Sequence, residues 1–291
     1  MTLYALLVQP FVEFGFMRRA LVATLALGLS CGPMGTLLVL RRMSLAGDAI
    51  AHALLPGAAL AFVAFGFSLW AMSLGGFLAA MLVAGLAGLV ARLTPQREDA
   101  SFAAFYMIAL AAGVMIVSLR GSSVDLMHVL FGSILAVDDA SLLLVAGIAS
   151  VSLLVLAAIY RPLVVECFDP GFLRSVGRTG PWMHGIFLVL LVLNLVGGFQ
   201  ALGTLMAVGL LMLPAAAARF WASEVWSLAA VASLFALLSG ACGLLLSYHA
   251  NLPSGPAIVL WAGGMYTASL LVGRRDSLLA RWLAHRWHGS V

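Results

Sequence analysis

The sequence contains no lysine, and only 9% of its 291 residues are charged. The missing lysine excludes a phosphate-binding P-loop, whose lysine contacts the nucleotide phosphates. Any ATP that drives this protein must therefore be bound by another chain. About a quarter of the residues in a soluble domain are charged. The low charge and the 64% of apolar residues together indicate a polytopic membrane protein that has no separate soluble domain.

Cysteine is also scarce. Cys31, Cys167 and Cys242 are far apart and form no CxxC pair, so the sequence predicts neither a thiolate metal cluster nor a disulfide framework. We interpret the three thiols as small apolar fillers in or near spans. The first 19 residues lack a basic n-region and an AxA-like cleavage site, which argues against a signal peptide.

Long apolar stretches account for most of the chain and predict an all-α fold of about nine transmembrane helices, or eight if one segment does not cross. The expected spans are about 19–40, 44–67, 70–91, 101–119, 140–160, 182–198, 201–218, 226–247 and 257–272. We expect one domain, 1–291, with an interfacial helix at 1–18 and a basic amphipathic tail at 274–291 on the membrane surface. The polar stretch after residue 119 predicts a short helix or a re-entrant segment.

The arginines predict the orientation of the chain. With the tail placed in the cytoplasm and the spans counted back, twelve arginines lie inside, and only Arg18, Arg19 and Arg120 lie outside. The net charge of +4 therefore acts as a topology signal rather than as a nucleic-acid surface. The count favours nine spans with the N-terminus outside.

One apolar span carries two ionisable residues, Asp48 and His52, within the stretch Met43–Gly57. On a helix these side chains are four residues apart and lie on one face. A carboxylate and an imidazole can bind a divalent metal, and ionisable residues inside a span are by default candidates for function. His52 lies about 15 Å along the helix from Arg42, roughly halfway through the hydrocarbon core. A buried hydrogen bond or an acid at a helix start is the alternative, and Pro56 with Gly57 predicts a kink beside the pair.

The longest polar loop between spans is Tyr160–Arg178, which has a turn signal at Asp169-Pro170-Gly171. The predicted topology places it in the cytoplasm. Its exposed aromatic candidates, Phe168 and Phe172, suggest a docking element for a cytoplasmic partner, whereas its composition alone fits a solvated connection equally well.

Several blocks of the sequence resemble the permeases of metal-ion ABC importers, the zinc/manganese/iron class. These blocks are RRMSLAGDAIAHALLPGAALAF (41–62), SSVDLMHVLFGSILAV (122–137), VECFDPGFLRSVG (165–177), ALGTLMAVGLLMLPAAAARF (201–220) and SYHANLPSGPAIVLWAGGMY (247–266). They occur in the order of the family and extend over about 30–275.

The resemblance implies a permease fold shared with cobalamin and siderophore importers, in the bacterial cytoplasmic (inner) membrane. Its expected partners are a second copy of the chain, cytoplasmic ATPase subunits that use ATP, an extracytoplasmic metal-binding protein and lipid, without nucleic acid. Asp48 and His52 match positions implicated in metal passage. The residues expected to couple to the ATPase are Phe168, Asp169, Pro170, Gly171, Phe172 and Leu173. Asn251 departs from the family, because many relatives have Asp there, and this weakens any proposal of an external acidic ligand.

The remaining polar residues have open interpretations. Asp125 and His128, on the external segment, either stabilise a helix end or contact metal or the binding protein. Asp138 and Asp139 are expected on a solvated face by default, and their alternatives are to attract cations or to contact the binding protein. Tyr248 and His249, in an outer turn, are possible metal contacts. His184, His285 and His288 are expected as surface or tail residues, and the Asn194 amide is expected to face other helices.

These observations predict the transmembrane subunit of an ATP-driven importer of a divalent metal, zinc first and manganese next, with no covalently bound cofactor and no enzymatic activity of its own. A gradient-driven metal transporter is the alternative; it needs the same Asp48 and His52 but no coupling segment. An intramembrane enzyme has little support, because the sequence contains no HExxH motif and no catalytic constellation.

Overall fold

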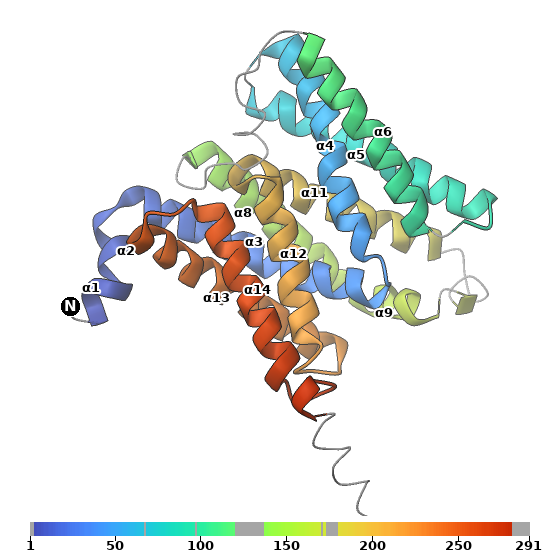
Figure 1. The fold of residues 1–291 in the computed structure, drawn as a ribbon. Helices are drawn as coiled ribbons and strands as arrows, with labels where there is room; N and C mark the ends of the chain where they lie inside the picture. The colour runs from blue at the N-terminus through green and yellow to red at the C-terminus, as the bar shows by residue number, and fades with distance from the viewer. Residues whose placement is uncertain are drawn as a thin grey trace, which may run out of the picture.

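A computed structural model of the chain describes residues 3–66, 68–96, 98–119, 137–169, 171–172 and 180–280. All regular secondary structure in these ranges is helical (Figure 1), which confirms the all-α prediction. The predicted short helix or re-entrant segment after residue 119 lies outside the described residues. The part of the predicted tail that follows residue 280 lies outside them as well.

The helices correspond to the apolar stretches of the sequence. The long ones are α3 (Gly15–Leu40), α4 (Ser44–Phe65), α5 (Leu69–Leu93), α6 (Glu98–Leu119), α8 (Asp139–Ala158), α11 (Gly180–Leu202), α13 (Val225–Ala250) and α14 (Ser254–Val272). The short ones are α1 (Leu3–Leu7), α2 (Gln9–Glu13), α9 (Tyr160–Phe168) and α12 (Thr204–Ala218). Within the described residues, eight helices are long and apolar enough to cross a membrane, and α12 is shorter. Each of the nine predicted spans falls on one of these nine longer helices.

The N-terminal region differs from the prediction of one interfacial helix followed by a span from residue 19. The structure has two short helices, α1 and α2, and α3 already begins at Gly15. Arg18 and Arg19 therefore lie within the long helix. Arg19 reaches Asp139 at the start of α8, with 3.3 Å between Nη1 and Oδ1. Long arginine side chains near a helix end can extend toward the interface, so the pair does not have to end the helix.

Gly28, Gly32, Pro33 and Gly35 of α3 permit either close helix approach or a break, and α3 continues through Pro33 to Leu40 without a break. The small residues instead permit close packing. A Cβ at Gly32 would overlap Ser233 of α13, and a Cβ at Gly35 would overlap the carbonyl oxygen of Leu211 in α12. Small residues at such positions are typical of helix interfaces in membranes.

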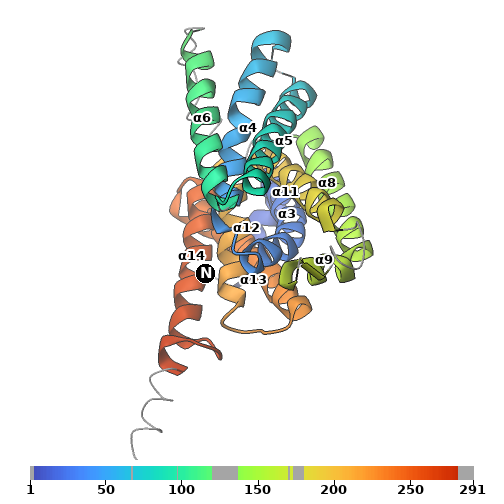
Figure 2. The ribbon, with the colours of Figure 1, turned by 90° about the vertical axis from the view of Figure 1, so that its right-hand side faces the viewer.

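The helices form two groups that α11 joins. Figures 1 and 2 both show α4, α5 and α6 together on one side of the molecule, and these three helices pack closely on one another. Helix α3 packs against α12 and α13, and α14 covers α12 and α13. Helix α11 contacts α4 and α5 of the first group and also α12, α3 and α8. It is also the span with the largest buried share in the described structure.

One polar contact in the core confirms a prediction from sequence. Asn194 of α11 is 1% exposed. Its Nδ2 donates to Ser152 Oγ of α8 at 2.8 Å and to the carbonyl oxygen of Leu190 at 2.8 Å. The amide therefore faces another helix and links α11 to α8, as expected for an amide that would otherwise lie in lipid.

Candidate functional site

The paired side chains of Asp48 and His52 lie near one another on α4. Asp48 Oδ1 and His52 Nε2 are 3.5 Å apart. Asp48 lies beyond the first turn of α4, which contains no acidic residue. The interpretation of Asp48 as a helix-start acid therefore has no support in the structure, because stabilisation by the helix dipole is confined to the terminal turn.

The separation of the two atoms suits two ligands of one metal better than a direct hydrogen bond. Good N–H···O hydrogen bonds are about 2.7–3.2 Å long. Two ligand atoms about 2.1 Å from one ion, at tetrahedral or octahedral angles, lie about 3.0–3.4 Å apart. The observed 3.5 Å is close to the upper end of that range. A small change in either side chain is enough for both to contact one ion.

The His52 ring is held between neighbouring helices. Its Nδ1 atom is buried and has no hydrogen-bond partner among the described residues. The ring of Tyr106, from α6, stacks on the imidazole with 6.0 Å between centroids and 27° between planes. The contact fixes one face of the imidazole and leaves Nε2 directed toward Asp48.

The kink expected at Pro56 and Gly57 does not open free space around the helix. Helix α4 runs unbroken from Ser44 to Phe65 with Pro56 inside it. A Cβ at Gly113 of α6 would meet the Pro56 ring and backbone at 3.1–3.3 Å. A Cβ at Gly57 would overlap the backbone of Gly75 in α5. The proline turn is therefore enclosed by α5 and α6, and α4 is held against both.

The pair is incomplete as a metal site within one chain. The Asp48 side chain is 52% exposed and that of His52 is 29% exposed. No group of three or more His, Cys, Asp or Glu residues that could hold a metal occurs among the described residues. Two ligands suit a transport site, because a permeating ion must also leave.

Part of the predicted coupling segment is described. Helix α9 ends at Phe168, and the Asp169 carboxylate accepts a hydrogen bond from the backbone N–H of Phe172 at 2.9 Å. The side chains of Phe168 and Phe172 are 66% and 55% exposed. Gly171 is exposed as well. Pro170 and Leu173 lie outside the described residues. Two exposed aromatic residues therefore lie at the end of α9 and at the turn that Asp169 stabilises.

The acidic residues at the start of α8 have structural contacts. Asp138 is the N-cap of α8, and its Oδ1 accepts from the backbone N–H of Ser141 at 2.9 Å. This hydrogen bonding lowers the pKa of Asp138 below its ordinary value. Asp139 pairs with Arg19. Asp125 and His128 lie outside the described residues, so their external role stays a prediction.

The candidates in the last turn of α13 also have structural roles. His249 Nε2 contacts the carbonyl oxygen of Leu6 at 2.9 Å, and the Tyr248 ring lies 5.7 Å from that of Phe14. Asn251 ends α13 in the left-handed conformation, with φ 54°. Asparagine tolerates this conformation better than most residues. The left-handed backbone at position 251 therefore accounts for the asparagine there.

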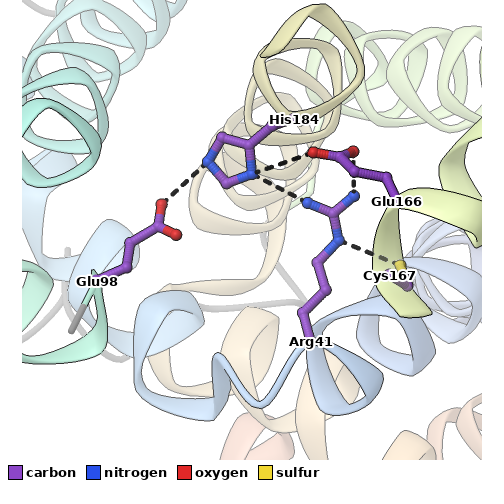
Figure 3. A network of polar contacts seen from close by, with 5 residues as sticks. All are labelled: Arg41, Glu98, Glu166, Cys167 and His184. Carbon is purple, nitrogen blue, oxygen red and sulfur yellow. Dashed lines mark hydrogen bonds and ion pairs between the residues drawn. The ribbon is translucent and has the colours of Figure 1, made fainter. Parts of the chain in front are cut away.

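Sequence reasoning missed a polar cluster at the ends of four elements. His184 was expected at the surface, but its side chain is only 16% exposed and lies between Glu98 and Arg41 (Figure 3). Glu166 and Cys167 of α9 complete the cluster. The surface interpretation of His184 was wrong because separate helix ends converge here. The one available signal was the predicted topology, in which all five residues are expected on the cytoplasmic side.

Comparisons with a family profile and with individual proteins point to the same family. The sequence profile described as the ABC 3 transport family matches residues 13–273. The chain is 34% identical over 264 residues to the manganese import system permease protein ScaB of Streptococcus parasanguinis, covering 91% of this chain and 93% of that protein. It is 30% identical over 285 residues to the chelated iron transport system membrane protein YfeD of Yersinia pestis, covering 97% and 93%.

A solved structure is similar over nearly the whole chain. It is PsaBC from Streptococcus pneumoniae in complex with Fab, with a TM-score of 0.83 and 30% sequence identity. The match covers 96% of this chain and 98% of that chain. The similarity therefore includes the helices that carry Asp48, His52 and the polar cluster.

Proposed function

The chain belongs to the ABC 3 transport family, and on that premise we propose that it is the transmembrane permease of a bacterial ABC importer that takes up manganese. The family match to residues 13–273 carries the proposal. An Asp–His pair inside an apolar helix supplies the metal chemistry. The sequence has no lysine for a P-loop, so ATP is hydrolysed by a separate subunit.

Manganese takes the place of zinc, which the sequence alone favoured, because of the relatives. The relative with 34% identity is named as a manganese importer, and another relative is named for chelated iron. Carboxylate and imidazole ligands suit manganese, iron and zinc alike, so the donor atoms do not choose among them. A gradient-driven transporter, the alternative, has no support in a family described as ABC transport.

A second copy of the chain is the proposed cover for the metal pair. The half-exposed Asp48 side chain on a span is costly to leave against lipid. A symmetric dimer that brings the two α4 helices together offers two carboxylates and two imidazoles to one ion. Cysteines introduced at position 48 in both copies are expected to crosslink in membranes, and their consistent failure to do so would count against a shared site.

The ATPase and an extracytoplasmic metal-binding protein are the other proposed partners. The exposed rings of Phe168 and Phe172 form the proposed contact with the ATPase. The binding protein delivers metal to the opposite face, where Asp125 and His128 are candidate contacts.

Metal uptake into proteoliposomes tests the function. The complete complex, reconstituted with the ATPase and the binding protein, is supplied with Mn²⁺ or Zn²⁺ in the presence of ATP. We expect ATP-dependent uptake that favours Mn²⁺ in the wild type and is lost in Asp48→Ala and His52→Ala. Asp139→Ala, a change to an exposed acid at the first residue of α8, serves as the matched control and is expected to retain uptake.

Preference for Zn²⁺ in this assay would correct the metal and leave the permease role in place. Normal Mn²⁺ uptake by Asp48→Ala would show that the metal crosses elsewhere. Absence of ATP-dependent uptake of either metal by the wild-type complex would remove the proposed function.

A further inference from the structure

Four elements meet in one polar cluster, defined by Arg41, Glu98, Glu166, Cys167 and His184 (Figure 3). Arg41 follows the last residue of α3, Glu98 is the first residue of α6, Glu166 and Cys167 lie on α9, and His184 lies in the first turns of α11. The cluster therefore joins the helix next to the coupling segment to the two helix groups of the fold.

Arg41 lies at the centre of the cluster. Its Nη2 donates to Glu166 Oε2 at 2.9 Å, and its Nη1 donates to His184 Nδ1 at 3.0 Å. Its Nε lies 3.3 Å from Cys167 Sγ, and its Cζ lies 4.2 Å from the centre of the Phe187 ring. All three guanidinium nitrogens thus have partners, two of them on α9. A lysine cannot reproduce this planar fork.

His184 extends the cluster to α6 with a defined direction of hydrogen bonding. Because Arg41 can only donate, His184 Nδ1 must accept, and the ring proton is then on Nε2. Nε2 donates to Glu98 Oε1 at 3.0 Å. The chain of contacts therefore runs from Glu166 through Arg41 and His184 to Glu98.

The cluster is largely buried, and its main effect is to fix the positions of the helices rather than to stabilise the fold. The side chains of Arg41 and Glu166 are 7% and 10% exposed, and that of His184 is 16% exposed. A buried ion pair is often no more stabilising than apolar side chains of the same volume, because desolvation offsets the attraction. What such a pair does provide is a fixed relative position of the elements that carry it.

Helix α6 continues from the cluster to the metal pair. It begins at Glu98 and carries Tyr106, whose ring stacks on His52. Eight residues of helix separate Glu98 from Tyr106, a distance of about 12 Å. Gly113 of the same helix lies against Pro56 of α4. A displacement of α6 at Glu98 therefore reaches these two contacts with α4, the helix that carries Asp48 and His52.

We propose that Arg41 and His184 are positioning residues that connect α9 to α6, so that a movement of the coupling segment is transmitted to the Asp48–His52 pair. The inference rests on the proposed function and adds the route by which ATP hydrolysis acts on the metal site. Neither residue contacts the metal; each acts through the helix that it holds.

The test separates coupling from folding. Proteoliposomes with the complete complex are assayed for Mn²⁺ and Zn²⁺ uptake and for ATP hydrolysis, and the readout is metal transported per ATP hydrolysed. His184→Leu removes both hydrogen bonds, whereas His184→Gln keeps an acceptor toward Arg41 and a donor toward Glu98. Arg41→Lys removes the guanidinium fork, and Arg42→Lys makes the same change at an exposed neighbour. Glu98→Ala removes the carboxylate that accepts from His184 at the edge of the cluster.

We expect His184→Leu and Arg41→Lys to lower the metal-to-ATP ratio by about 2- to 30-fold, the range expected for residues that carry coupling. His184→Gln and Arg42→Lys should keep the wild-type ratio, and the ATPase should copurify with every variant. If His184→Leu does not fold, Glu98→Ala, which removes the acceptor for His184 Nε2, should show the same loss of coupling.

An unchanged ratio in His184→Leu, Arg41→Lys and Glu98→Ala, with a wild type that transports metal, would overturn this inference and leave the proposed function standing. Loss of folding or of the ATPase in all three would also overturn it, because the cluster would then be structural. If the wild type hydrolyses ATP but transports neither metal, the proposed function fails and the inference fails with it.

Discussion

Gly57 of α4 and Gly75 of α5 lie backbone to backbone. A Cβ built on Gly57 would overlap the carbonyl oxygen of Gly75, and a Cβ built on Gly75 would overlap the carbonyl oxygen of Gly57. The relationship is reciprocal, so a side chain on either glycine would push the two helices apart. It lies one residue after Pro56 and five residues after His52, and it fixes the part of α4 that follows the metal pair.

This contact predicts a strong effect of one added methyl group. Gly57→Ala forces α4 away from α5 and should lower the free energy of unfolding by about 1–3 kcal/mol, as overpacking does. Metal uptake should fall as well, because His52 and Tyr106 then lose their alignment. Gly85→Ala on α5 is the matched control, since a Cβ there meets no atom within 4 Å. Thermal unfolding in detergent and uptake measure both effects, and equal behaviour of the two variants would contradict the packing argument.

The exposed rings after α9 predict a defect in assembly. Phe172 is 55% exposed at the turn that Asp169 stabilises. Phe172→Asp places a charge on the proposed ATPase contact. A charge there is unfavourable, because charged residues are depleted in the cores of protein interfaces. We expect the ATPase to be lost on copurification and uptake to stop. Phe172→Leu, which keeps an apolar side chain, should retain both. Copurification and uptake unchanged in Phe172→Asp would remove this docking surface.

The N-cap of α8 predicts a pH-dependent contribution to stability. Asp138→Ala removes the acceptor for the Ser141 N–H and should cost about 0.5–2 kcal/mol. The lowered pKa of Asp138 in the folded chain means that its charge stabilises the fold above the unfolded carboxyl pKa. That contribution is lost as the pH falls through the folded pKa, in the acid range below about pH 4.

Asp138→Asn separates the cap from the charge, because its amide oxygen still accepts the hydrogen bond. Thermal unfolding of the three proteins between neutral and acid pH is the measurement. The wild-type advantage over Asp138→Asn should vanish in acid, whereas the deficit of Asp138→Ala relative to Asp138→Asn should persist. A wild-type advantage that grows on acidification would contradict the sign of the pKa shift.

The thiol of Cys167 is predicted to react slowly. Burial raises the pKa of the Cys167 thiol, although the nearby Arg41 guanidinium partly offsets this effect. The thiolate is the reactive form, and its fraction falls about tenfold for each unit by which the pKa rises. Maleimide labelling of Cys167 at neutral pH should therefore be slower than labelling of an Arg42→Cys variant in which Cys167 is replaced by serine. Equal labelling rates would show that Cys167 is freely accessible in its ionised form.

The fold was predictable from sequence to the extent that it depends on neighbouring residues. The nine spans were found because runs of apolar residues of sufficient length are a local signal, and all nine fall on helices. The errors occurred where local signals compete. Arg18 and Arg19 predicted a helix boundary, but Gly15–Leu40 forms one helix. Pro33 lies inside α3 without breaking it, and Gly32 and Gly35 pack closely against α13 and α12.

The sequence by itself determined that Asp48 and His52 share one face of a helix, whatever surrounds that helix. Through the distribution of its arginines, it also predicts the side of the membrane on which each polar end lies. Only the tertiary structure decided that Arg41 meets Glu166 and His184, which are 125 and 143 positions away in the sequence. The physical reason is that a helix is specified by contacts within a few residues, whereas a cluster depends on the rotation and approach of whole helices. Close glycine contacts such as Gly57 with Gly75 set that approach, and no local pattern in the sequence records which glycines will face each other.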